Sequence, residues 1–96
     1  MSEKQFLLIV YDISNDRRRT KLHDALLGYG SPVQYSVFEC LLDAKEQARM
    51  KKTVAKIISP KKDHVRTYYL CKTCLTKTEV TAPGPAVLSE PAAIIV

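Results

Sequence analysis

The first candidate for chemistry is an aspartate that stands between an apolar segment and a basic one. Residues Phe6–Tyr11 are all apolar, Asp12 follows directly, and three arginines at positions 17–19 precede Thr20 and Lys21. Carboxylate oxygens are ligands that Mg²⁺ prefers, and basic side chains bind phosphate. The pattern therefore suits a metal-assisted reaction on a phosphodiester, in which the metal activates water and stabilises a pentacovalent phosphate.

Asp12 and its neighbours also have structural interpretations. An aspartate at the end of a strand commonly forms a turn. For a metal site, one Asp12 from each of two subunits would meet at a two-fold axis, where a cation or a shared proton must offset their repulsion. Tyr11 alternates to the opposite face of the strand, so packing is its expected role and a place in the site is the alternative. Asn15 and Asp16 are expected to cap the next helix.

The basic cluster is the second candidate, with members Arg17, Arg18, Arg19 and Lys21. These cations begin a predicted helix, at the end where the helix dipole favours acids. An arrangement that works against local stability often marks a functional site. We expect at least one of them to contact phosphate, although a solvated helix face is the usual interpretation of such a run. A second basic set on the next helix is more often a solvated surface, and it would extend this one only if the fold places it beside the first cluster: Lys45, Arg49, Lys52 and Lys56.

The composition is that of a small basic domain. The chain has 96 residues, 46% of them apolar, a net charge of +5 and a pI near 9.2. The charge favours an anionic partner, nucleic acid before a membrane surface, although some proteins are simply basic. The three cysteines, an odd count without a recognisable signal peptide, favour reduced thiols and a cytoplasmic location. No apolar segment is long enough to span a bilayer, so no membrane association is expected.

Hydrophobic periodicity predicts strands alternating with helices. Strands are expected over 5–11, 33–42 and 65–71, and the second of these could break into a hairpin or carry a bulge near Ser36. Helices are expected over about 16–27 and from Asp43, which forms a capping box with Glu46, to Ser59. The second helix is expected to turn one face inward, formed by Ala44, Ala48, Val54 and Ile58.

The predicted order fits an α+β, ferredoxin-like βαββαβ sandwich with an added C-terminal strand. Residues 1–81 would form this domain. Residues 82–96 would be a linker and an apolar strand of the same domain, which pairs with a sheet edge of its own subunit or of a partner. A short strand is expected near 79–81.

Three further groups of residues have weaker claims on chemistry. Ser36 lacks a neighbouring histidine, and His23 and His64 have no evident acidic partner, so a Ser-His-Asp enzyme is not expected. Phe38 is expected in the core or a dimer interface, with stacking on a base as the alternative. The Cys71-x-x-Cys74 segment is interpreted as a structural turn, because zinc lacks a second ligand pair and no helix is predicted there.

Several segments together resemble the smaller of the two universal CRISPR adaptation proteins, the "Cas two" family, which is also described as an endoribonuclease. They are residues 10–16, the Arg18-Arg19 pair with Lys21, residues 30–40, the Cys71-x-x-Cys74 segment and the final Ile94-Ile95-Val96. One departure is Pro32, where many members have a basic residue that is a candidate phosphate contact.

The resemblance implies a ferredoxin-like homodimer that bridges integrase dimers during spacer insertion into the repeat array. It also implies Mg²⁺-dependent phosphodiester hydrolysis, reported for some members, with Asp12 as catalytic and metal-binding residue. Three functions then compete: a metal-dependent endonuclease acting on single-stranded RNA or duplex DNA, a non-catalytic adaptor that binds DNA and docks the CRISPR integrase, and a small ligand-sensing regulator. The adaptor has the firmest basis. A regulator is less expected, because a ligand sensor would be expected to have a glycine-rich loop and the chain has only three glycines.

Overall fold

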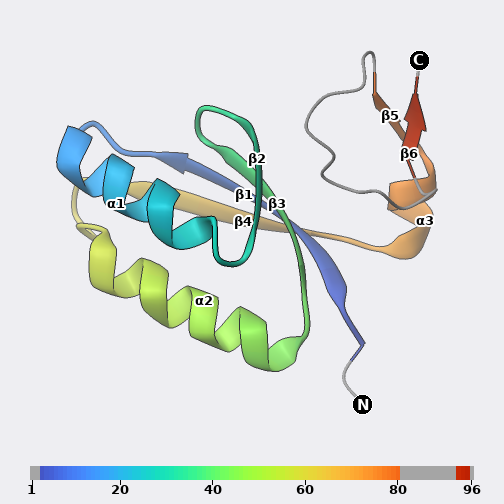
Figure 1. Cartoon of the computed structure of the whole chain (residues 1–96), viewed down its shortest axis with the longest axis horizontal. Helices are drawn as coiled ribbons and strands as arrows, with labels where there is room; N and C mark the ends of the chain where they lie inside the picture. The colour runs from blue at the N-terminus through green and yellow to red at the C-terminus, as the bar shows by residue number, and fades with distance from the viewer. Residues whose placement is uncertain (1–2, 81–92, 96) are drawn as a thin grey trace.

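The computed structural model describes residues 3–80 and 93–95 (Figure 1). Within them the helices and strands follow the predicted alternation. In chain order they are β1 (Gln5–Asp12), α1 (Asp16–Leu26), β2 (Gly30–Gln34), β3 (Val37–Leu42), α2 (Ala44–Ile57), β4 (His64–Leu70), α3 (Lys72–Thr76), β5 (Thr78–Val80) and β6 (Ala93–Ile95).

A four-stranded antiparallel sheet with the order β2-β3-β1-β4 forms the centre of the fold. The central strand β1 pairs with β3 on one side and with β4 on the other. Helices α1 and α2 lie together on one face of this sheet (Figure 1). This order and layering confirm the predicted ferredoxin-like βαββαβ arrangement.

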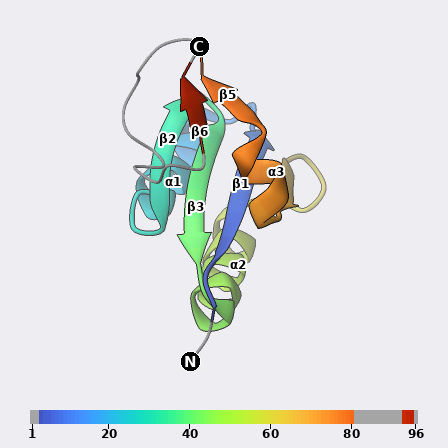
Figure 2. The same cartoon turned by 90° about the vertical axis from the view of Figure 1, so that its right-hand side faces the viewer.

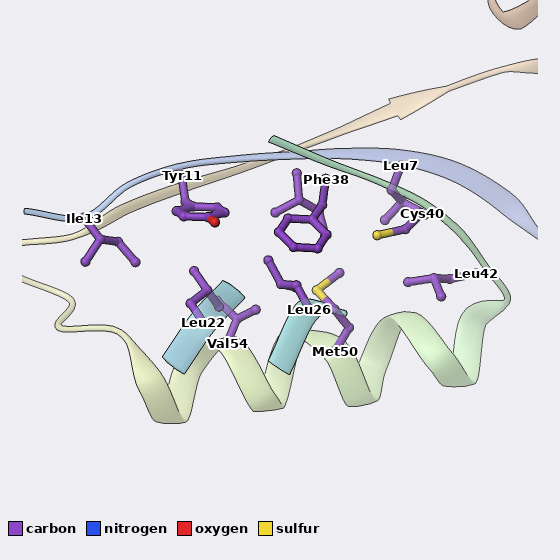
Figure 3. Close-up of a cluster of buried hydrophobic side chains, with 11 residues drawn as sticks. Leu7, Tyr11, Ile13, Leu22, Leu26, Phe38, Cys40, Leu42, Met50 and Val54 are labelled. Carbon is purple, nitrogen blue, oxygen red and sulfur yellow. The ribbon is translucent and has the colours of Figure 1, made fainter. Parts of the chain in front are cut away.

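The hydrophobic core lies between the sheet and the two helices (Figure 3). Alternate residues of β1 and β3 point toward the helices, because side chains alternate across a strand. Leu22 and Leu26 of α1 meet them, as the helical spacing predicts. Helix α2 contributes Met50 and Val54. The expected inward face of α2 was therefore partly wrong: Ala44 and Ala48 are exposed, and the longer Met50 fills the space.

Local signals explain where the two long helices begin. The Asn15 side chain accepts a hydrogen bond from the backbone N–H of Arg18 at 2.9 Å and caps α1. Asp43 and Glu46 form the predicted capping box at the start of α2, with reciprocal hydrogen bonds of 2.8 and 2.9 Å. These bonds satisfy backbone donors that the first helical turn leaves without partners.

The segment predicted as one strand over 33–42 is a hairpin, as the alternative interpretation had it. β2 and β3 are joined by Tyr35 and Ser36, with a register shift between Pro32 and Gln34. β2 lies close against β3 where it begins, because a Cβ atom at Gly30 would overlap the backbone oxygen of Glu39 and the Sγ of Cys40. Glycine is required by this approach.

The C-terminal part differs from the prediction at Cys71–Cys74. Instead of a turn, these residues form the N-cap and first turn of α3. The helix leads into β5, which pairs in parallel with β6, so the terminal strand pairs within its own chain. These elements lie at the end of the sheet away from α1 and α2 (Figures 1 and 2). The predicted linker falls almost entirely on residues 81–92, outside the described residues, so the domain assignment stays a prediction.

Candidate nucleic-acid and metal site

Asp12 is the last residue of β1 and is exposed. Residues two apart in a strand share a face, so Asp12 lies on the same face as Phe6, Leu8 and Val10. This is the face of the sheet opposite α1 and α2. Helix-facing residues of β1 alternate with these, as the buried Tyr11 beside Asp12 shows. The candidate carboxylate therefore stands at one end of the face that the two long helices leave uncovered.

A metal site cannot be completed by the described part of one chain. No group of three or more His, Cys, Asp or Glu side chains there is placed to hold a metal ion. Mg²⁺, however, is commonly bound by one or two carboxylates, with substrate phosphate and water supplying the other ligands. The exposed Asp12 fits that sparse donor set when a second copy contributes its own Asp12.

Arg18 is engaged inside the fold. Its Nε and Nη2 donate hydrogen bonds of 2.8 and 3.1 Å to the two carboxylate oxygens of Asp63, in the loop between α2 and β4. The backbone N–H of Ser59 donates a third, at 2.7 Å. These bonds, the one from Arg18 first, lower the pKa of Asp63. Arg18 therefore joins α1 to this loop, and its two donors to Asp63 are not directed at solvent.

Arg19 also makes contacts within the chain. Its Nη1 donates a hydrogen bond of 3.0 Å to the backbone oxygen of Ile13, and its Nη2 contacts the Asp16 carboxylate. The side chain remains 38% exposed. Arg19 thus stabilises the turn that follows Asp12 while part of its guanidinium still faces solvent.

Arg17 and Lys21 are exposed and lie one helical turn apart on α1. No ion pair involves either of them among the described residues. Helix α2 lies beside α1, and it exposes a second basic set: Lys45, Arg49, Lys52 and Lys56. The two helices that carry the basic sets are therefore neighbours, and a shared binding surface stays a prediction. We call these six residues the basic helical layer.

Tyr11 and Phe38, the two aromatic candidates, pack in the core (Figure 3). Tyr11 also holds the β2–β3 turn: its hydroxyl donates to the Tyr35 backbone oxygen at 3.1 Å and its N–H to that of Ser36 at 3.0 Å. Burial raises the pKa of Tyr11, which keeps the phenol protonated as a donor. Phe38 is fully buried, next to the His23 ring, and offers no exposed face to a base.

Two residues at this end of the molecule were not assigned to the site from the sequence, where His64 was set aside because it had no evident acidic partner. His64 is the cross-strand partner of Asp12, so their side chains lie on the same face. Tyr35, at the hairpin turn, is 96% exposed and lines a hollow of about 190 Å³ with Arg19 and Thr20. Asp12 and His64 are 52 positions apart in the sequence, so no local sequence pattern could have indicated that they are paired. The possible hairpin near Ser36 could have indicated that Tyr35 is exposed, because a turn places its residues at the surface.

The sheet face that carries Asp12 also exposes large apolar side chains. Leu41 is 41% exposed and Tyr68 45% exposed, and the β1 register places both on this face beside partly buried Leu8. We call this surface the open face. The β1 register also places the charged Glu39 and Arg66 on this face. Exposed large apolar side chains with polar residues around them are typical of a site that meets another protein.

Comparison with known proteins identifies the family. The family model described as CRISPR associated protein Cas2 matches residues 5–78. The chain belongs to the Cas2 family. A protein named CRISPR-associated endoribonuclease Cas2 3, from Chloroflexus aurantiacus, is 43% identical over 81 residues, which are 84% of this chain and 87% of that protein.

Solved structures of Cas2 proteins share the fold. Cas2 of Streptococcus pyogenes, in a crystal structure at pH 6.5, has a TM-score of 0.71 and 29% identity, covering 80% of this chain and 99% of that one. A chain of a partial Cas6-RT-Cas1–Cas2 complex has a TM-score of 0.68 and 29% identity, covering 77% and 87%. In the described part of this chain, no helix has the length and apolar character needed to cross a membrane.

Proposed function

We propose that this Cas2-family protein acts in CRISPR adaptation as a homodimer that binds nucleic acid, joins the CRISPR integrase and hydrolyses phosphodiesters with Mg²⁺. One observation supports this most strongly: Asp12 stands at the end of a sheet face that exposes large apolar side chains, and Arg17 and Lys21 of the basic helical layer follow it closely in the sequence. Relatives named endoribonuclease and the similar chain in a Cas1–Cas2 complex support the nuclease and integrase parts.

Homodimer formation is proposed to occur through the open face. Burying Leu41, Tyr68 and their neighbours against a second copy would remove apolar surface from water, at about 25 cal/mol per Å². A two-fold axis makes such an interface self-complementary, so each copy presents the same patch. The two Asp12 side chains, both on this face, would then approach each other from the two subunits.

Each subunit contributes positioned groups to the proposed reaction centre. The Arg19 contact with the Ile13 oxygen fixes the turn after Asp12, and Tyr11 anchors the neighbouring hairpin turn. His64 lies opposite Asp12, where its imidazole can hydrogen-bond a phosphate oxygen. When bound between the carboxylates, Mg²⁺ would supply charge stabilisation for the phosphate and an activated water.

Nucleic acid is proposed to bind along the basic helical layer. Arg17 and Lys21 are the members of the first cluster that are exposed and outside the described ion pairs, whereas Arg18 is held by Asp63. The α2 cations extend the layer, and two copies would double the net charge from +5 to +10. Such a surface suits a phosphate backbone, because phosphate contacts supply most sequence-independent affinity.

Salt-dependent binding of a labelled DNA duplex and a single-stranded RNA tests this assignment. Each phosphate contact contributes about 0.9 to the slope of log K against log salt for duplex DNA. Replacing Arg17 and Lys21 by alanine should reduce the slope for duplex DNA by about 0.9 for each lost contact. Lys4→Ala is the matched control, because Lys4 precedes β1 at the end opposite Asp12. An unchanged slope in the double variant would remove these two residues from the binding surface.

A non-catalytic adaptor is the second candidate function. It is favoured by the basic helical layer, which binds nucleic acid without a catalytic group. Comparison of the wild type with the Asp12→Asn variant separates the candidates. If the protein is an adaptor, neither form cuts a substrate. Both forms then bind duplex DNA and support spacer integration together with the integrase. A nuclease loses cleavage in the same variant while its binding persists.

A further inference from the structure

Cys71 and Cys74 form a thiol pair that the proposed nucleic-acid function does not use. Both residues are exposed, and their Sγ atoms lie 3.2 Å apart. The Sγ of Cys71 also accepts a hydrogen bond of 3.3 Å from the backbone N–H of Cys74. The polypeptide therefore holds two oxidisable thiol sulfur atoms side by side at the surface.

We propose that Cys71 and Cys74 are a reversible dithiol–disulfide site that exchanges with low-molecular-weight disulfides such as oxidised glutathione. A disulfide bond is about 2.05 Å long. The sulfur atoms thus need to approach by about 1.2 Å, which side-chain rotation can supply. The site goes beyond the proposed function and does not depend on it, because it rests on the geometry of this pair.

The exchange balances in two steps. The Cys71 thiolate attacks one sulfur of the small disulfide, so a mixed disulfide forms and one small thiolate leaves. Cys74 then gives up its proton to solvent and attacks the Cys71 sulfur, which closes the intrachain disulfide and releases the second small thiolate. Two protein thiols are oxidised by two electrons, and one small disulfide is reduced to two thiols.

The surroundings distinguish the roles of the three cysteines. The hydrogen bond between the two exposed thiols lowers the pKa of Cys71 and raises that of Cys74, so Cys71 is the attacking thiolate. Cys40 is buried in the core, where burial, followed by the charge of Glu39, raises its pKa to about 11. Cys40 therefore serves as an unreactive thiol within the same chain.

The site is remote from Asp12. The pair follows directly after β4, whose last residue, Leu70, lies opposite Phe6. Asp12 is six residues farther along β1, about 20 Å at the usual rise of a strand. Disulfide formation would fix the first turn of α3, and hence the path of the chain from the main sheet into β5.

Thiol counting on the full chain tests the proposal. Reduced protein is incubated with oxidised glutathione, alkylated after unfolding and analysed by mass spectrometry. Free thiols should fall from three to one per chain, with Cys71 linked to Cys74, and dithiothreitol should restore all three. Cys74→Ser should instead accumulate glutathione on Cys71, because the second step is absent.

Matched variants and alternative outcomes decide the result. Cys71→Ser should form no intrachain disulfide, and it should become glutathionylated more slowly than Cys74→Ser, because Cys74 is the weaker thiolate. Both substitutions fall on exposed positions and should leave the fold intact. Three persistent free thiols, glutathione on both cysteines of the wild type, or a disulfide only between chains would overturn the proposal.

Discussion

At the residue scale, Asp63 shows how the fold uses a charge. In the part of the chain that the structure describes, Asp63 is the one charged residue that is buried, and its side chain has no exposed area. Arg18 contacts both of its carboxylate oxygens. A buried carboxylate without such a partner would be strongly destabilising. The pair therefore fixes α1 against the loop that leads from α2 to β4.

This pair predicts a stability loss in acid. Because the pKa of Asp63 is lowered in the folded state, its contribution is fully present above the unfolded value of about 3.9. It is lost as the pH falls through the folded value. Asp63→Asn should lower the urea midpoint at pH 7 and flatten its decline below about pH 4. Urea unfolding across this pH range provides the measurement.

Asp16→Asn is the control for Asp63, because the Asp16 side chain is 88% exposed. Its urea midpoint should stay close to that of the wild type at both pH values. An Asp63→Asn protein with the wild-type midpoint at pH 7 would contradict the stabilising role of the pair.

At this scale the sequence indicated the basic cluster, but it could not show which of its members pair within the fold and which remain exposed. Arg17 and Arg18 are adjacent, and each has the same local pattern. The partner that withdraws Arg18 is 45 residues away in the sequence. The same reason hid His64, because its position opposite Asp12 depends on the β1–β4 register. Long-range pairing, which no local pattern encodes, decides which cations remain exposed.

At the element scale, the capping box of α2 gives a second prediction. Asp43→Ala removes the acceptor of the 2.8 Å bond from the Glu46 backbone N–H. The unfolding free energy should fall by about 1 kcal/mol, the usual cost of losing an N-cap side chain. Lys52→Ala, at an exposed position in the same helix, should change it by less than about 0.5 kcal/mol. Denaturant unfolding checks both, and equal effects would contradict the capping argument.

The elements that the sequence predicted are those with strong periodic or capping signals. β1, α1 and α2 are present close to their predicted bounds, because apolar spacing and the Asp43–Glu46 box are local features. Helix α3 was missed because five residues are too few for a periodic pattern. Its N-cap is also a cysteine, whose sulfur takes the place of the usual oxygen acceptor.

At the scale of the whole molecule, the open face is the surface that the proposed dimer would cover. One face of the sheet packs on α1 and α2, whereas the open face leaves Leu41 and Tyr68 substantially exposed. A small domain buries a limited share of its surface, so a second copy would add considerably to the buried apolar area. The proposed two-fold dimer accounts for both features.

Leu41→Glu tests the dimer. The symmetric interface would place two new carboxylates near apolar surface, so the dimer dissociation constant should rise at least about tenfold, or 1.4 kcal/mol. Leu27→Glu is the matched control, because Leu27 is 50% exposed at the end of α1 and off the open face. Sedimentation velocity across a dilution series measures both. Equal dissociation constants for the two variants would contradict an interface on the open face.

The central claim is that Asp12 from two subunits supports Mg²⁺-dependent phosphodiester cleavage. The most direct measurement is cleavage of labelled single-stranded RNA and duplex DNA, with Mg²⁺ or with chelator, by the wild type, Asp12→Asn and Asp16→Asn. Loss of a direct ligand should cost at least as much as the 10- to 100-fold typical of outer-shell groups. We predict metal-dependent cleavage that falls about 100-fold or more in Asp12→Asn alone. Cleavage that survives this substitution, or none by the wild type, would contradict the claim.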